Sequence, residues 1–211
     1  MTEPDTKTLI LDAAEHAFAD LGFDAASLRH IISVAGVNLA AVHYHFGSKE
    51  ALIAAVFSRR LGPLNQERLR LLDEIEAAHP KDLPVEKVLE ALVGPALRLA
   101  RDPAKGGPVV MRLFGRTIAE PSEYLQRLLN DQFGDVVKRF TGALHRALPS
   151  LPPAVLFWRM VFVIGAMGHL MCDPQKLKEM SKGKCDPENT DEAIKQLVAF
   201  LAAGMKAQVP K

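Results

Sequence analysis

The spacing of apolar residues constrains the fold of this chain more than any other feature of its sequence. Between positions 10 and 21, apolar residues recur every three or four positions: Ile10, Ala13, Ala14, Ala17, Phe18 and Leu21. A longer stripe with the same spacing runs from Val85 to Ala100, with an expected kink at Pro95. Such intervals place side chains on one face of an α-helix. No segment alternates apolar and polar residues between turn signals, so the sequence predicts an all-α protein without a sheet.

Helix-capping residues divide the first 60 positions into short helices. Ser27 can cap a helix that ends at Gly36, and Asn38 and Ser48 can cap the next two helices. Gly36 can adopt the left-handed backbone of a tight turn, and Val37 fills the corner that follows it. Two short helices that meet at such a corner are typical of the helix-turn-helix motif, which places its second helix in the major groove of DNA.

Positive charge is concentrated in the same region. The net charge of the whole chain is only +1. Residues 27–60, however, hold Arg29, Lys49, Arg59 and Arg60 against Glu50 alone, which is a local excess of three positive charges. A positive excess within the predicted helix-turn-helix region suits a surface that faces the phosphates of DNA.

The N-terminus and the cysteines favour a cytoplasmic protein. Residues 1–10 carry acids where a secretory signal peptide carries bases. No stretch reaches the roughly 18 uncharged apolar residues that a membrane span needs. The two cysteines, Cys172 and Cys185, are too few for a disulfide framework. We therefore expect a cytoplasmic protein that does not bind a membrane.

The rest of the chain is also predicted to be helical. Gly62-Pro63 should interrupt or kink the helix that contains it, and residues 101–108 should form a loop. Helical patterns resume at about 108–119, 122–148, 152–171 and 190–207. The polar stretch 173–190 contains one short helical candidate, residues 175–180.

Residues 8–57 resemble the TetR family of bacterial regulators. The features in common are Gly22-Phe23, Ser27-Leu28, Ala35-Gly36-Val37, the run from Val42 to Phe46, Lys49-Glu50 and Leu52. The resemblance implies a three-helix helix-turn-helix domain, residues 1–57, followed by a helical effector-binding and dimerisation domain, residues 58–211. It also implies a homodimer on a palindromic double-stranded DNA operator, acting as a repressor that a ligand releases.

The resemblance assigns roles to individual residues of the motif. Ser27, Tyr44 and Lys49 would bind phosphate oxygens, with Lys49 helped by the N-terminal dipole of its helix. Arg29 would contact a phosphate or a base edge. The residues that would face the major groove are Asn38, Leu39, Ala40 and His43.

Other interpretations of these residues stay open. Tyr44 could pack in a core, and Lys49 could belong to an ordinary solvated helix start. His43 and His45 cannot easily share a metal ion, because their spacing points them roughly 200° apart on a helix. We therefore expect no metal site here, with His43 in the groove, His45 partly buried and Phe46 in the core.

Strings in both domains resemble the fatty-acid-responsive regulators of the PsrA type. The strings in common lie at residues 38–59, 61–63, 111–113, 156–159 and 200–205. Apolar residues from three helices could wall an effector cavity, and Arg112 and Arg116 lie one helical turn apart. An arginine fork suits a carboxylate or phosphate, so we expect a long-chain fatty acid or acyl-CoA. The predicted ligand-binding residues are Leu92, Val93, Arg112, Leu113, Arg116, Phe133 and Phe140.

Alternatives to this ligand site are also open. The two arginines could pair with Glu120, Glu123 or Asp131, and the apolar residues could simply fill a core. The effector could be an unrelated hydrophobic molecule. The dimer interface is expected on helices 152–171 and 190–207, unless their stripes cover only their own subunit's core. Those stripes are Val155, Trp158, Val161, Phe162 and Gly165, and Ile194, Leu197, Val198, Leu201 and Met205.

The sequence offers no basis for an enzyme. Paired carboxylates, a Ser-His-Asp set, a phosphate-binding glycine loop and a zinc signature are all missing at the required spacings. His169, Cys172 and Cys185 match no zinc pattern, so isolated thiols are the better interpretation. We expect no cofactor. A helical adaptor that does not bind DNA is the remaining alternative.

Overall fold

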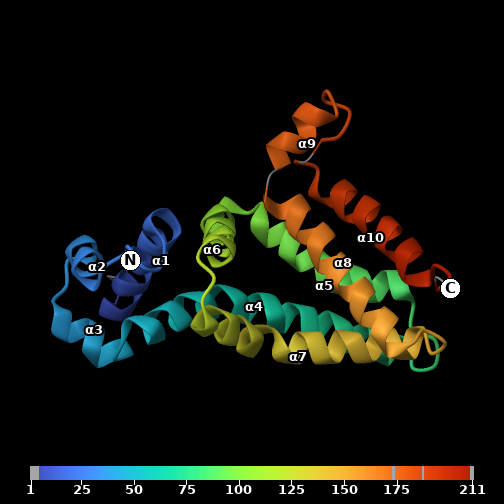
Figure 1. Ribbon diagram of the computed structural model, residues 1–211, viewed down its shortest axis with the longest axis horizontal. Helices are drawn as coiled ribbons and strands as arrows, with labels where there is room; N and C mark the ends of the chain where they lie inside the picture. Colours follow the sequence, from blue (N-terminus) through green and yellow to red (C-terminus); the bar gives the residue numbers. More distant parts are fainter. Residues whose placement is uncertain (1–4, 173, 187, 210–211) are drawn as a thin grey trace. The chain divides into compact units, whose positions relative to one another are not determined.

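The computed structural model describes residues 5–172, 174–186 and 188–209, and within these ranges it contains helices and no strand (Figure 1). The all-α prediction is confirmed. In chain order the elements are α1 (Thr6–Leu21), α2 (Leu28–Ala35), α3 (Leu39–Phe46), α4 (Lys49–Ala78), α5 (Val85–Ala100), the 3-10 turn η1 (Pro103–Lys105), α6 (Gly107–Ala119), α7 (Glu123–Ala147), α8 (Pro153–Cys172), α9 (Pro174–Met180) and α10 (Thr190–Lys206). The segment 101–108, expected to be a loop, is partly helical, because η1 occupies Pro103–Lys105 and α6 begins at Gly107.

Side-chain caps begin the short N-terminal helices where the sequence predicts. Ser27 accepts a hydrogen bond from the backbone N–H of His30 at 3.1 Å, and Asn38 accepts one from Ala41 at 2.9 Å. Ser48 accepts one from the backbone N–H of Ala51 at 3.1 Å. Each such cap stabilises its helix by about 1 kcal/mol, which matters for helices of eight residues.

The structure corrects the expected interruption at Gly62-Pro63. α4 continues through Pro63 for 30 residues. A proline inside a helix removes one backbone hydrogen bond. Leu61 and Leu64, on either side of Gly62-Pro63, are both buried, at 0% and 9% exposure.

Backbone packing divides the chain into two compact units. Unit 1 consists of Met1–Pro63 with Gly106–Gln132, and unit 2 consists of Leu64–Lys105 with Phe133–Lys211. Both α4 and α7 therefore contribute to each unit. This division differs from a boundary at residue 57, because residues 106–132 belong with the N-terminal helices.

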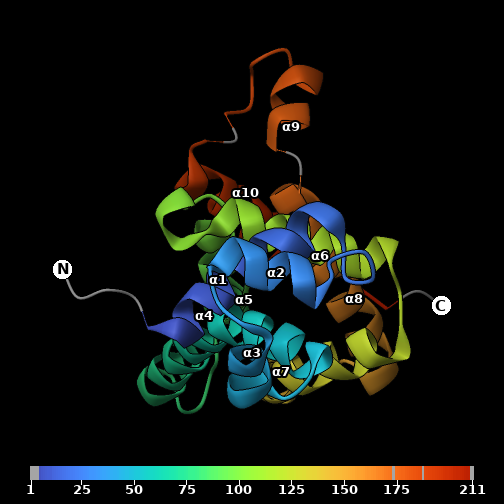
Figure 2. The ribbon, with the colours of Figure 1, turned by 90° about the vertical axis from the view of Figure 1, so that its left-hand side faces the viewer.

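Unit 1 is built around a row of aromatic rings. The ring centroid of Phe23 lies 5.8 Å from that of Phe18 and 5.9 Å from that of Phe57, and Phe57 lies 6.1 Å from Phe114 of α6. α6 is thus a structural part of the unit that carries α1, α2 and α3 (Figure 2). Leu21, which ends the predicted stripe of α1, is 45% exposed and does not join this core.

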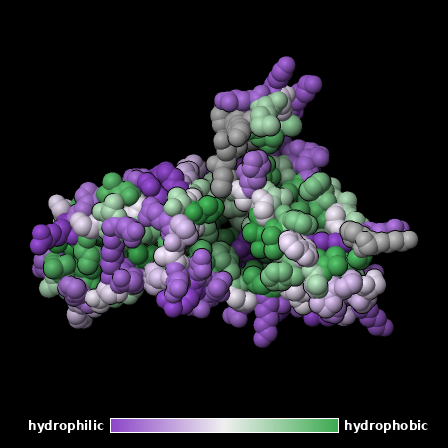
Figure 3. Space-filling model, in the orientation of Figure 1, coloured by the Kyte–Doolittle hydropathy of each residue, from purple (hydrophilic) through white to green (hydrophobic). Residues whose placement is uncertain are grey.

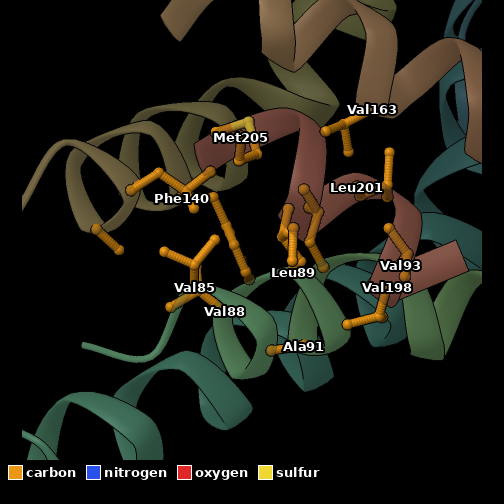
Figure 4. Close-up of a cluster of buried hydrophobic side chains, with 14 of the residues drawn as sticks. Val85, Val88, Leu89, Ala91, Val93, Phe140, Val163, Val198, Leu201 and Met205 are labelled. Atoms are coloured by element: carbon orange, nitrogen blue, oxygen red, sulfur yellow. The ribbon is translucent and has the colours of Figure 1, made fainter. Parts of the chain in front are cut away.

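The core of unit 2 is built around α5. Val88, Leu89, Val93 and Leu97 of this helix are completely buried. Side chains from α7, α8 and α10 surround them, among them Phe140, Val163, Leu201 and Met205 (Figure 4). The apolar stripe of α10, from Ile194 to Met205, is therefore buried inside its own subunit. It does not form the dimer interface that the sequence analysis assigned to it, because it covers α5 instead.

A different face of the late helices stays uncovered. Phe157, Trp158 and Phe162 of α8 are 67%, 64% and 62% exposed, and Phe200 of α10 is 72% exposed. Trp158 and Phe162 stack with ring centroids 6.1 Å apart. Figure 3 shows the apolar surface over α8. By length and composition alone, residues 153–171 could also span a membrane.

The polar stretch before α10 holds the short helix predicted there, now seen as α9. Asp173 and Pro187, in the same stretch, lie outside the described residues, as does the side chain of Cys172. Cys185 is a free, exposed thiol. No group of three or more metal-ligating side chains occurs among the residues that the structure describes.

Candidate DNA-binding surface and effector region

The corner between α2 and α3 has the geometry of a helix-turn-helix. Gly36 adopts the left-handed backbone conformation, with φ 67° and ψ 29°, and the next residue's N–H donates to the carbonyl of Ile32 at 3.1 Å. Ile31 of α2 and Val42 of α3 are fully buried. These two side chains fix both helices against α1, which leaves the outer face of α3 free.

The outer face of α3 carries the residues predicted to meet the major groove. Asn38, Leu39, Ala40 and His43 are all exposed. Tyr44 is 85% exposed, and its ring meets the neighbouring His45 ring edge to face, with centroids 5.0 Å apart. A packing role for Tyr44 is therefore wrong. Phe46, expected in the core, is only half-buried.

The imidazole of His43 is oriented by its own backbone. Its Nδ1 lies 3.0 Å from the carbonyl oxygen of Gly47. Since a carbonyl oxygen only accepts hydrogen bonds, Nδ1 must be the protonated nitrogen. Nε2 of the neutral ring then has its lone pair available to accept from a base edge.

Besides Tyr44, the structure shows Ser27 and Lys49, which are predicted to bind phosphates, and Arg29, which is predicted to contact a phosphate or a base edge. Ser27 is exposed, and its hydroxyl hydrogen can still donate although its oxygen caps α2. Arg29 is exposed on the first turn of α2. Lys49, at the first turn of α4, is half-buried and donates to the backbone carbonyl of Asp24 at 3.1 Å. Lys49 therefore connects the loop after α1 to the start of α4, and its remaining N–H groups can reach a phosphate.

Two family matches account for most of the chain. Residues 10–56 match the family described as bacterial regulatory proteins of the tetR family, and residues 90–204 match the tetracyclin repressor-like C-terminal domain. The chain belongs to the TetR family. It is accordingly a helix-turn-helix transcriptional regulator, a class that does not consist of enzymes.

Curated relatives match parts of this TetR-family chain. It is 36% identical to the transcriptional regulator UidR of Escherichia coli over 86 residues, which cover 40% of this chain and 41% of UidR. It is 32% identical to the regulator BetI of Rhizobium meliloti over 127 residues, 60% of this chain and 58% of BetI. The chain thus spans about two-fifths to three-fifths of these relatives' length.

Solved structures of similar fold cover nearly the whole chain. The regulator FadR from Bacillus subtilis in complex with stearoyl-CoA has a TM-score of 0.64 at 14% identity, with 93% of this chain and 98% of that chain covered. A SmeT–triclosan complex has a TM-score of 0.67 at 20% identity, with 98% and 99% covered. At these identities the likeness shows the TetR fold.

A cavity of about 330 Å³ lies within unit 1 behind the helix-turn-helix. Lys49 and Glu50 of α4 line it together with Glu120 and Tyr124 from the α6–α7 region. The Tyr124 hydroxyl donates to the backbone carbonyl of Glu50, and Glu120 accepts from the backbone N–H of Phe23 at 2.8 Å. Burial raises the pKa of Tyr124, so the phenol stays protonated and can act as this donor. The loop after α1 and the first turn of α4, which flank the helix-turn-helix, are therefore hydrogen-bonded to Glu120 and Tyr124.

The structure corrects the predicted arginine fork. Nε of Arg112 lies 3.2 Å from a carboxylate oxygen of Asp20. Arg116 donates from Nε to the carbonyl of Ala19 at 3.2 Å, also to the carbonyl of Asp20, and pairs with Glu120 at 3.4 Å. The last carbonyls of a helix lack partners within the helix, and the guanidinium of Arg116 satisfies those of α1. Both arginines therefore belong to unit 1, and these partners are residues of that unit.

The remaining predicted ligand residues do not form one site. Leu113 is buried in unit 1, whereas Leu92, Val93 and Phe140 are buried in unit 2. Phe133 begins the unit 2 part of α7 and is half-buried. Three of these residues thus fill the α5-centred core, as the alternative interpretation states.

Arg68, which the sequence analysis did not single out, is buried inside unit 2. It is 3% exposed, and burial lowers its pKa to about 10, so it stays charged at neutral pH. Nε donates to the carbonyl of Leu92 at 2.8 Å and Nη1 to Oδ1 of Asn65 at 3.3 Å. The sequence holds no signal for this burial, because the surrounding run NQER is typical of a solvated helix face.

Proposed function

We propose that this TetR-family regulator is a repressor that binds a palindromic operator as a homodimer and leaves it when a long-chain acyl effector binds. The exposed outer face of α3 is the observation that supports DNA binding. Its side chains are exposed, while Val42 on the inner face is completely buried. Ser27, Arg29, Tyr44 and Lys49 would hold phosphates, and Asn38, Leu39, Ala40 and His43 would contact bases.

The homodimer is supported by the uncovered apolar face of unit 2. Large apolar patches are rare on monomeric soluble proteins, and aromatic side chains at a half to three-quarters exposure lose water contact when a partner covers them. Phe157, Trp158 and Phe162 of α8 and Phe200 of α10 are such side chains. A second copy of the chain would cover them, and a palindromic site matches the symmetry of such a pair. This interpretation of α8 also accords with a cytoplasmic protein.

The acyl effector is supported by two independent likenesses. The PsrA-type strings imply a fatty-acid response, and a structure of similar fold contains stearoyl-CoA. Unit 2 supplies the apolar helical environment that an acyl chain needs. The SmeT–triclosan likeness favours the second candidate, a different hydrophobic effector in the same unit.

A gel-shift experiment tests the proposal. The DNA upstream of the protein's own coding region serves as probe, titrated first with protein and then with palmitate, palmitoyl-CoA or triclosan. We expect a shifted complex with two-fold footprint symmetry, released by at least one acyl compound. The variant Tyr44→Phe should weaken binding, and a matched exposed change, Lys138→Gln on α7, should not. A complex that is indifferent to both acyl compounds would contradict the acyl effector.

A further inference from the structure

Arg68 carries a positive charge that the core of unit 2 does not neutralise. No carboxylate forms an ion pair with Arg68 in the described ranges, and desolvation alone accounts for the shift in its pKa. Its three hydrogen-bond partners are a backbone carbonyl, an amide oxygen and a thioether. Burying an ion without a counter-ion costs several kcal/mol, so this arrangement is unfavourable unless an anion completes it.

The weakest of these partners marks the direction from which an anion can arrive. Nη2 of Arg68 faces Sδ of Met167 at 3.7 Å. A thioether sulfur is a poor acceptor, whereas a carboxylate oxygen at the same place would form a charge-assisted hydrogen bond. A guanidinium has five N–H donors, and the bonds in the described part of the chain use three of them.

The surroundings of Met167 can adapt to an incoming chain. Met167, Leu170 and Met171, near the end of α8, pack against the core and are only half-buried. Methionine side chains are unbranched and flexible, so they can move aside at low cost. Met167 and the carbonyl of Leu92 both contact Arg68, so a chain that displaces the half-buried methionines of α8 would reach Arg68 beside α5.

We propose that Arg68, supported by Asn65, binds the carboxylate of a fatty-acid effector inside unit 2, with the acyl chain between α5 and the end of α8. This inference rests on the proposed acyl response and assigns its head-group site. It also replaces the arginine pair of α6, in which Arg112 pairs with Asp20 and Arg116 donates to the carbonyls of Ala19 and Asp20. A buried site of this kind selects a small anionic head over the bulky head group of a thioester.

The site also has a structural alternative. In that alternative, Arg68 only donates to the carbonyl of Leu92 and so holds α4 against α5. In that case a ligand's charge would not matter to it. The two roles differ in one measurable quantity, the ratio of affinities for palmitate and for its uncharged methyl ester.

The test uses titration calorimetry of the full chain with palmitate, methyl palmitate and palmitoyl-CoA. For the native protein we expect palmitate to bind at least about tenfold more tightly than methyl palmitate, since charge-assisted hydrogen bonds are worth a factor of about ten or more. Arg68→Met should bring this ratio close to one, and Arg68→Lys should restore part of it.

Arg159→Met is the matched control. Arg159 is also a buried arginine of unit 2, but it donates to the carbonyls of Met205 and Ala207 at 2.6 and 2.8 Å and so ends α10. Its replacement should lower the melting temperature and leave the affinity ratio unchanged. The melting temperature of ligand-free Arg68→Met should change little, because the lost hydrogen bonds are offset by removal of an unneutralised charge.

Three results would overturn the assignment. The first is a ratio of palmitate to methyl palmitate affinity near one in the native protein. The second is a ratio that stays high in Arg68→Met. The third is tighter binding of palmitoyl-CoA than of palmitate by the native protein. The last two would leave the proposed acyl response standing. The proposed response itself fails only if neither palmitate nor palmitoyl-CoA releases the native protein from its operator, so the two failures are distinguishable.

Discussion

Glu15 of α1 is a buried carboxylate whose removal should destabilise unit 1 measurably. It is 2% exposed and accepts hydrogen bonds from Arg60 of α4, at 2.8 Å from Nε and 3.0 Å from Nη2, and a further one from Arg59. The change Glu15→Gln keeps the shape of the side chain and removes its charge. Both guanidinium groups then lose a buried negative partner at the contact between α1 and α4.

The expected size follows from the burial of the three side chains. Removing one partner of a buried ion pair typically costs about 3–5 kcal/mol. Water reaches both arginines in part, since their side chains are 23% and 28% exposed, and Arg59 keeps its pair with Asp12. We therefore expect a loss of about 2–3 kcal/mol in the free energy of unfolding. For a chain of this length the melting temperature should fall by about 4–12 °C.

Thermal unfolding followed by circular dichroism measures this loss, and Glu67→Gln is its control. Glu67 also accepts two hydrogen bonds from one arginine, Arg70, at 2.8 and 2.7 Å, but it is 45% exposed. Exposed pairs contribute about 0–1 kcal/mol, so the control should shift the melting temperature by at most about 4 °C. Equal shifts in the two variants would refute the claim that burial makes the Glu15 pair important.

Three further predictions use four substitutions in the helix-turn-helix region and on the exposed face of α8. Lys49→Ala should weaken binding to every DNA sequence and lower the slope of log affinity against log salt by about 0.9 per half-site, whereas His43→Ala should alter base preference with little change in slope, both measured by fluorescence anisotropy. Similar salt slopes for the two variants would show that one role is misassigned. Phe162→Asp should give a monomer by light scattering at micromolar concentration, and a dimer as stable as that of the control Lys138→Asp would contradict the α8 interface. Gly36→Ala should cost about 1–2 kcal/mol through the left-handed backbone alone, because no atom lies within 4 Å of the added methyl group; an unchanged melting temperature would refute this.

The helix-turn-helix could be predicted from the sequence because its determinants are local. The caps at Ser27 and Asn38 bond to backbone N–H groups three residues away, and Gly36 adopts the conformation that its position requires. The outward direction of His43 and Tyr44 follows from helical spacing once Val42 is placed inside. Interactions of this range are complete within a single turn of the chain.

The effector region could not be predicted in the same way. Arg112 and Arg116 share a helix face, which the sequence shows, but their partners lie more than 90 residues earlier on α1. The stripe of α10 is apolar whether it meets α5 or a second subunit. Periodicity reveals that a face is buried and carries no information on what buries it.

The amino-acid sequence alone determined the helical class of this protein, the positions of most helix ends and the outward face of α3, because backbone capping and helical spacing act over three or four residues. Only the tertiary structure decided which charges are neutralised. It turned the arginines of α6 towards α1, covered α5 with α10, and enclosed Arg68 without a carboxylate partner among the residues that the structure describes. Those outcomes depend on contacts between segments far apart in the chain, where the energies of burial and desolvation outweigh any local preference.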